Sequence, residues 1–223
     1  METSACRERE LRLPLGDGEL RGDLTLPAQP RGVVLFAHGS GSSRFSLRNR
    51  RVAALLVEGG LASLLFDLLT PAEAERDRND AHLRFDLPLL TGRLVAAIDG
   101  WGQRPELTAL PLGLFGASTG AATALAAAAL RPAMVRAVVS RGGRPDLARP
   151  MLGRVRCPTL LIVGDRDPEV LSLNRQAARL LSCPHELRLI AGASHLFEEG
   201  DTLDQVALLA RQWFLRNLPP SPG

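Results

Sequence analysis

The stretch GLFGASTGAATALAAAAL, residues 113–130, decides the fold, because an apolar run turns directly into a helix within it. Residues 110–118 are predicted as a buried strand and residues 119–130, rich in alanine, as the helix that follows. Between them lies Gly116-Ala117-Ser118-Thr119-Gly120, which fits G-x-S-x-G. Glycines suit such a sharp turn because neighbouring backbone leaves no room for side chains. Ser118 is either a helix cap in a tight turn or a hydroxyl that the turn presents, and the rest of the chain must decide.

Outward from this turn, buried apolar strands alternate with amphipathic helices. The chain opens with an antiparallel hairpin, in which residues 11–15 and 19–27 flank a turn at 16–18. Further strands are predicted at 32–39, 61–69, 110–118, 135–143, 157–165 and 185–193, and helices at 47–60, 87–101, 119–130, 168–181 and 202–218. This order predicts an α/β fold with a mostly parallel, eight-stranded sheet covered by helices on both faces. A single domain over residues 1–223 is expected, with tails at about 1–9 and 219–223.

Composition indicates a globular cytoplasmic protein. Apolar residues make up 45% of the 223 residues, but no apolar stretch approaches the ~20 residues of a membrane span. The first ten residues are charged and contain no apolar core of a secretory signal. Cys6, Cys157 and Cys183 are scattered along the chain, which is typical of reduced thiols. Cytoplasmic location without membrane association is therefore expected.

Neither nucleic acid nor a cofactor is predicted as a partner. All 27 basic residues are arginines, and they alternate with acids to a net charge of only +3, so no basic stripe forms. Histidines and cysteines share no metal-ligand spacing. Gly39-Ser40-Gly41 begins like a dinucleotide fingerprint, but Arg44 stands where the third glycine belongs.

The carboxyl ends of parallel strands meet at one edge of a sheet, and four chemically useful side chains fall there. Ser118 follows one strand, His195 follows the last strand, and two acids, Asp165 and Asp167, follow the strand between them. A serine nucleophile needs a base and an orienting acid, in the chain order Ser, Asp, His. Asp167 is favoured as the acid, because two extra residues let its carboxylate reach toward His195. It can at the same time cap the helix that begins at Pro168.

Four motifs in this order resemble the α/β-hydrolase superfamily, in particular its dienelactone-hydrolase-like branch. They are HGSGSSR (38–44), GASTG (116–120), GDRDPEVL (164–171) and GASH (192–195), and the resemblance runs from about Leu11 to Leu218. It implies Ser118 as nucleophile, His195 as base and Asp167 as orienting acid. It also implies an oxyanion hole formed by the backbone N–H groups of Ser40 and Thr119. Dienelactone hydrolases proper use a cysteine nucleophile, so Ser118 favours a plain ester or thioester.

The sequence thus predicts a serine hydrolase that cleaves a small carboxylic ester or thioester through an acyl-enzyme. The alternative is a non-catalytic binding protein on a hydrolase scaffold. Only residues 140–156 separate the sixth and seventh strands, too few for a helical cap, so an open site is expected. Some relatives of this branch are fused to phosphoribosyltransferase domains, and none is expected here. A monomer or a homodimer is expected.

Several arginines follow the strand ends and are candidates for binding an acidic substrate. Arg44, Arg48, Arg50 and Arg51 come after the presumed oxyanion loop, whereas Arg141 and Arg144 come after the sixth strand. Arg44 and Arg141 are favoured because they lie in turns, where guanidinium groups suit a carboxylate or phosphate. The alternative is that these arginines form a solvated helix face or pair with Asp67 or with the acids of residues 71–80.

Overall fold

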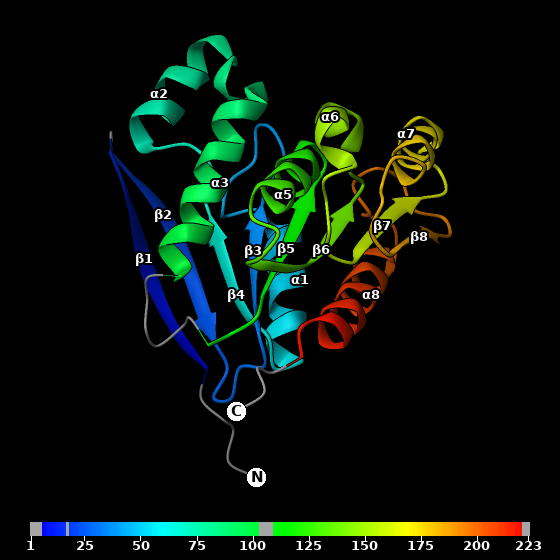
Figure 1. Ribbon diagram of the computed structural model, residues 1–223, viewed down its shortest axis with the longest axis horizontal. Helices are drawn as coiled ribbons and strands as arrows, with labels where there is room; N and C mark the ends of the chain where they lie inside the picture. Colours follow the sequence, from blue (N-terminus) through cyan, green and yellow to red (C-terminus); the bar gives the residue numbers. More distant parts are fainter. Residues whose placement is uncertain (1–5, 17, 103–108, 220–223) are drawn as a thin grey trace.

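The computed structural model describes residues 6–16, 18–102 and 109–219, which form one eight-stranded sheet (Figure 1). The strand order is β1-β2-β4-β3-β5-β6-β7-β8. β1 pairs antiparallel with β2, and β2 pairs antiparallel with β4, while β3 to β8 run parallel. The strands are β1 (Arg7–Leu15), β2 (Gly18–Leu26), β3 (Val33–Ala37), β4 (Ala62–Phe66), β5 (Leu112–Ala117), β6 (Val135–Arg141), β7 (Thr159–Gly164) and β8 (His185–Ile190). The predicted α/β fold and strand count are confirmed; Asp17 of the predicted turn lies outside the described residues.

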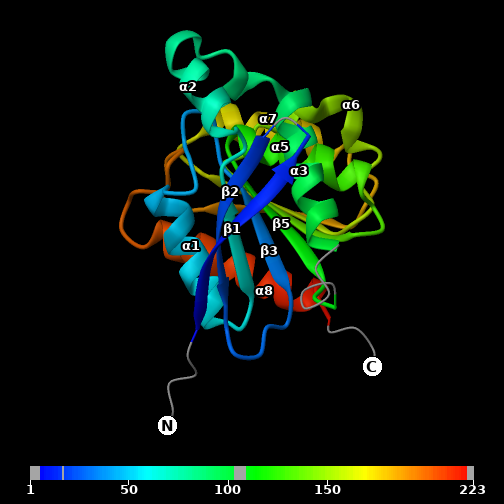
Figure 2. The same cartoon turned by 90° about the vertical axis from the view of Figure 1, so that its left-hand side faces the viewer.

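Helices cover both faces of the sheet. Helices α1 (Leu47–Glu58) and α8 (Thr202–Asn217) pack on one face. The other face carries α3 (Leu87–Gly102), α5 (Thr119–Leu130) and α7 (Pro168–Ala178). Figure 2 shows α1 on one side of the sheet and α3 on the other. Within the described ranges, no helix combines the length and the apolar character that crossing a bilayer requires.

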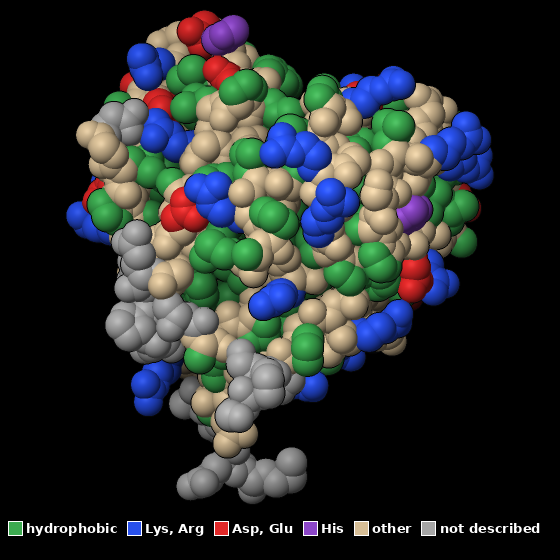
Figure 3. Space-filling model, in the orientation of Figure 1, with side chains coloured by type: hydrophobic (Ala, Val, Ile, Leu, Met, Phe, Trp, Pro, Cys, Tyr) green, Lys and Arg blue, Asp and Glu red, His purple; other side chains and the backbone are tan. Residues whose placement is uncertain are grey.

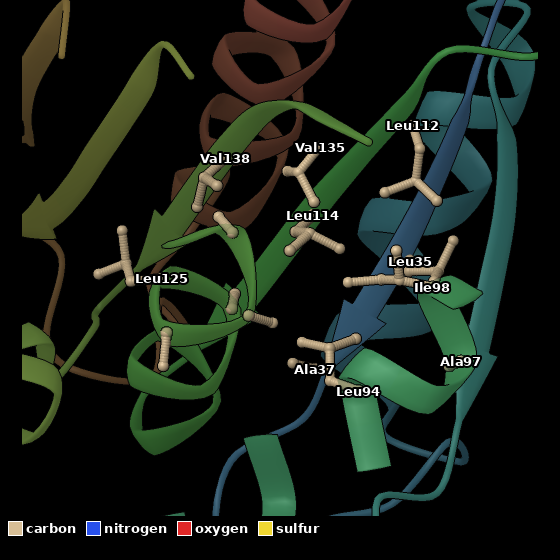
Figure 4. Close-up of a cluster of buried hydrophobic side chains, with 14 of the residues drawn as sticks. Leu35, Ala37, Leu94, Ala97, Ile98, Leu112, Leu114, Leu125, Val135 and Val138 are labelled. Atoms are coloured by element: carbon tan, nitrogen blue, oxygen red, sulfur yellow. The ribbon is translucent and has the colours of Figure 1, made fainter. Parts of the chain in front are cut away.

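Residues of the central strands alternate between two buried apolar layers, which is why β3, β4, β5 and β7 read as nearly unbroken apolar runs. Leu35, Leu114 and Val138 pack with α3 and α5, and Figure 4 shows these side chains converging. Their neighbours Phe36 and Phe115 face α1 and α8. Helix α5 is buried almost all round, because its alanines let the backbone lie close to the sheet. This rigid centre carries the turn at Ser118.

Helix α2 (Pro71–Asp80) and the 3₁₀ turn η1 (Leu83–Phe85) were not predicted from the sequence. α2 is polar and has no apolar stripe, so hydrophobic periodicity does not reveal it. It begins with a capping box between Thr70 and Glu73, with proline at the first helical turn. Buried acids then anchor it, because Glu73 pairs with Arg93 and Asp77 pairs with Arg84. The T-P-x-E pattern was the available signal.

The connection from β6 to β7 contains only the short turns η2 (Pro145–Ala148) and α6 (Arg149–Leu152). Both pack beside α5. No cap domain is inserted there, as expected from the length of this segment.

Candidate active site

Ser118 occupies a strained backbone position at the junction of β5 and α5. Its φ of 52° and ψ of −121° lie in a region that costs a non-glycine residue about 1–3 kcal/mol. A Cβ at Gly116 would collide with the backbone of Ala121, and one at Gly120 with the carbonyl oxygen of Ala37. The Ser118 side chain makes no capping hydrogen bond to α5. The turn therefore presents the hydroxyl rather than using it as a cap.

The three residues predicted from the strand ends lie in one hydrogen-bonded chain. Ser118 Oγ lies 3.2 Å from His195 Nε2, and His195 Nδ1 lies 2.7 Å from Asp167 Oδ2. A carboxylate can only accept a hydrogen bond, so His195 Nδ1 carries the proton and donates a hydrogen bond to Asp167. Nε2 is then left as an acceptor for the serine proton. This arrangement matches a nucleophile, a general base and an orienting acid.

The two acids after β7 have different partners. Asp167 Oδ2 accepts from His195, while its Oδ1 accepts from the N–H of Val170 at 3.3 Å and caps α7. Asp165 Oδ1 instead accepts from the N–H of Gly192 at 2.8 Å and remains exposed. A single carboxylate thus both caps the helix and orients the histidine, and Asp165 stabilises the loop that precedes His195.

The loop after β3 lies against Ser118. A Cβ at Gly39 would come within 3.2 Å of Ser118 Cβ, so the glycine permits the close approach. The Thr119 N–H forms no hydrogen bond with the described residues and stays free at the helix start. The Ser40 N–H donates to Thr119 Oγ1 at 2.7 Å. An oxyanion could accept a hydrogen bond from the Thr119 N–H directly. At the Ser40 N–H it would have to share the donor with the Thr119 hydroxyl or displace that hydroxyl.

His38 holds this loop in place, a role that its sequence position did not reveal. Its Nδ1–H donates to the carbonyl oxygen of Gly39 at 2.9 Å, and its Nε2 accepts from the N–H of Leu68 at 3.1 Å. Burial disfavours the imidazolium and holds the pKa of His38 below its ordinary value. The neutral ring fixes the Gly39 carbonyl and therefore the direction of the next amide, that of Ser40.

Acid should destabilise the protein through His38. In the unfolded chain His38 takes up a proton as the pH falls below about 6.5, while the lowered pKa means that the folded chain takes it up only at a lower pH. Between the pKa of the unfolded chain and the lower pKa of the folded chain, the unfolded state binds more protons. The free energy of unfolding therefore falls by up to about 1.4 kcal/mol for each unit by which the pH drops in that range. Urea unfolding at about pH 7.5 and about pH 5 should show a smaller drop for His38→Gln than for the native chain. Equal drops would contradict this role.

Two cavities flank the loop at residues 39–42. The smaller, of about 230 Å³, contains Ser118 and His195 together with Asn49, Arg141 and Leu196. The larger, of about 530 Å³, lies toward α2 and is lined by Arg44, Asp67 and Arg84. The described residues include no group of three or more His, Cys, Asp or Glu side chains that could hold a metal ion. The smaller cavity would place a bound group beside Ser118.

Most of the candidate arginines are paired with acids. Arg44 donates to Asp67 at 2.7 Å and approaches Asp23 at 3.5 Å. The helix-face arginines and the arginine after β6 pair likewise: Arg48 with Glu198, Arg50 with Asp23, Arg51 with Asp204 and Arg144 with Asp146. In Figure 3 the basic side chains are spread over the visible face rather than gathered in a stripe. The structure brings Arg141 into the cavity that contains Ser118 and places Arg44 in the neighbouring one.

Comparison with known proteins agrees with this geometry. The model of the "Dienelactone hydrolase family" matches residues 20–212. A crystal structure of dienelactone hydrolase from Anabaena variabilis is 51% identical, covers 96% of this chain and 99% of its own, and superposes with a TM-score of 0.94. Est1E from Butyrivibrio proteoclasticus shares the fold at 14% identity, with a TM-score of 0.78 over 93% of this chain and 98% of its own.

Curated relatives extend beyond the matched region. Two proteins from strains of Mycobacterium tuberculosis, each named "Putative phosphoribosyl transferase", are 54% identical over 219 residues. That alignment covers 97% of this chain but 48% of each relative, so the chain spans about half their length. The family model, by contrast, covers most of this chain, including every residue of the hydrogen-bonded chain around Ser118. The chain therefore belongs to the dienelactone hydrolase family.

Proposed function

We propose that the protein is a serine hydrolase that cleaves a carboxylic ester, or a thioester, of a small molecule through an acyl-enzyme. The observation that carries this proposal is the chain of hydrogen bonds from Ser118 through His195 to Asp167, at 3.2 and 2.7 Å. Because all three residues follow sheet strands, the reacting hydroxyl is aligned before any substrate binds. Membership of a hydrolase family supports the same reaction class.

In the proposed reaction, Ser118 Oγ attacks the carbonyl carbon while His195 Nε2 accepts the hydroxyl proton. The carbonyl double bond opens into a tetrahedral oxyanion, and its collapse expels the alkoxide or thiolate. His195 returns the proton to that leaving group. Water then repeats the sequence on the acyl-enzyme, releasing the carboxylic acid and restoring Ser118. Asp167 stays ionised and stabilises the imidazolium in both halves.

The oxyanion would be held by backbone amides at the start of α5. The free N–H of Thr119 points from the positive end of that helix, and the Ser40 N–H is the second donor of the proposed hole. Preorganised donors of this kind contribute about 10²–10³ each to kcat, because they meet charge only as it develops. His38 supports the second donor by fixing the Gly39 carbonyl.

The name of the Mycobacterium tuberculosis relatives describes another chemistry, phosphoribosyl transfer. The nucleophile, base and acid of the proposed hydrolase all lie within the half that those relatives share with this chain. The proposed hydrolysis therefore rests on residues within the region that this chain shares with those longer proteins. The proposal predicts that this chain alone hydrolyses esters without a phosphoribosyl donor.

A labelling experiment separates the hydrolase from a binding protein on the same scaffold. An organophosphonate probe should label the native chain at Ser118 and leave Ser118→Ala unlabelled. A panel of acyl esters and thioesters of differing chain length should show turnover by the native chain only. An unlabelled native chain that turns over no ester would favour the binding protein.

Activity should not depend on a lipid–water interface. The short β6–β7 connection carries no cap, so nothing built there has to open before substrate reaches the cavity. The rate on a short-chain ester should therefore rise smoothly through the concentration at which the substrate forms micelles. A jump in rate at that concentration would show a closed site that an interface opens.

A further inference from the structure

Arg141 stands apart from the other arginines around the site because no acid balances it. Arg141 lies on β6, the strand next to β5, directly beside Ala117 and Ser118. Ala117 pairs with Arg141, and the Ser118 N–H donates to the Arg141 carbonyl oxygen. The residue is 6% exposed. Among the described residues, no carboxylate lies within ion-pair distance of its guanidinium.

The partners that Arg141 does have are neutral or aromatic. Nη2 donates to Asn49 Oδ1 at 3.1 Å, and the guanidinium lies over the ring of Phe197, with its carbon 5.8 Å from the ring centroid. Nε has no hydrogen-bond partner. Burial, together with the nearby charge of Arg48, lowers the pKa of Arg141 to about 10, so it remains a cation at neutral pH. A buried cation without a counter-charge is costly to the fold and is tolerated where a ligand supplies the missing anion.

The surroundings of Arg141 favour an anion. The cavity that it lines also contains Ser118 and His195. Helix α1 opens onto the same cavity through Ser46 and Arg48, and its first turn contains no acidic residue. The positive end of a helix and a buried guanidinium therefore face one space beside the nucleophile.

We infer that Arg141, held by Asn49, forms a subsite for a carboxylate or phosphate group carried by the ester substrate. This inference rests on the proposed function, because it takes the bound anion to be part of the ester that the proposed hydrolase cleaves. The anion would bind the part of the guanidinium that lines the cavity, while the ester carbonyl lies at Ser118. Charged esters are then selected over neutral esters of the same shape, because only they relieve the buried charge.

Binding can be measured without catalysis. In a Ser118→Ala background, succinate and inorganic phosphate serve as separate probes in thermal unfolding. The anion that fits should raise the Tm with concentration, and adding Arg141→Gln should abolish the rise. Arg131→Gln is the matched control, since Arg131 pairs with Asp99 near the far end of α5. The control variant should respond as the parent does. If neither anion raises the Tm of the parent, the subsite does not exist.

Catalytic selectivity provides the second measurement. A monoester of succinic acid and an ester bearing a phosphate group are each compared with a neutral ester of similar size. The native chain should favour one charged ester by about 10- to 100-fold in kcat/KM, and Arg141→Gln should reduce that ratio to about one. Arg141→Lys, which keeps the charge but not the planar donors, should retain part of the preference.

Stability distinguishes a binding role from a structural one. Arg141→Gln removes a buried charge that has no counter-charge, so without added anion the variant should unfold at the same Tm as the native chain or higher. A clearly lower Tm, or equal kcat/KM on charged and neutral esters by the native chain, would overturn the inference. An anion-dependent Tm in Ser118→Ala together with no ester turnover by the native chain would instead refute the proposed hydrolase and leave the anion site standing.

Discussion

Replacing Ser118 by alanine is expected to lower kcat on the preferred ester by about 10⁶-fold, and His195→Ala should cost about as much. The double variant should lose no more than either single variant. The reason is that the two side chains act as one unit: His195 Nε2 has no proton to take without Ser118, and the hydroxyl is a weak nucleophile without His195. Steady-state kinetics on one ester measures all three losses.

Thermal unfolding provides the control for these variants. Ser118 makes no capping bond, so Ser118→Ala should keep a near-native Tm, and its loss of activity then reports chemistry rather than folding. If the losses of the single variants multiply in the double variant, Ser118 and His195 act independently. That result would contradict the proposed transfer of the Ser118 proton to His195.

Asp167→Asn is expected to lower kcat by about 10⁴-fold, while Asp165→Asn should leave it nearly unchanged. The amide of an asparagine at 167 can donate to His195 Nδ1, which favours the tautomer with its proton on Nε2. That nitrogen then cannot accept the proton of Ser118. Asparagine is still a good helix cap, so α7 should keep its start and the Tm should change little.

The two aspartates form a matched pair for this test. Both follow β7, but Asp165 bonds only to the loop at Gly192. Kinetics of the two variants on the same ester therefore compares the orienting carboxylate with a neighbour of the same chemistry. Strong impairment of Asp165→Asn with a nearly normal Asp167→Asn would reverse the assignment.

The central strands β3, β4, β5 and β7 could be read from the sequence because they are buried on both faces. Runs such as Val33–Ala37 are apolar throughout, and the alternation with amphipathic helices leaves few topologies. Helix α2 was not predicted from the sequence, because ion pairs rather than an apolar stripe hold it to the protein. Its capping box at Thr70 and Glu73 was visible, but a cap without periodicity is a weak signal.

The site residues were predictable only where chain order alone brings them to one sheet edge. Ser118, Asp167 and His195 follow strands, so the rule for parallel sheets brings them to one edge, but the rule alone does not choose between Asp165 and Asp167. Asn49 lies inside α1, and its contact with Arg141 joins positions 92 residues apart, which no local pattern encodes. The pairing of Arg44 with Asp67 was left as an alternative for the same reason.

The central claim, an acyl-enzyme at Ser118, is tested most directly by trapping that intermediate. An ester with a good leaving group and a slowly hydrolysed acyl group is mixed with the native chain, quenched in acid during turnover and weighed by intact-protein mass spectrometry. We expect a mass increase of one acyl group, mapped by proteolysis to Ser118 and absent from Ser118→Ala. Turnover without any adduct, or an adduct on another residue that persists in Ser118→Ala, would contradict the account.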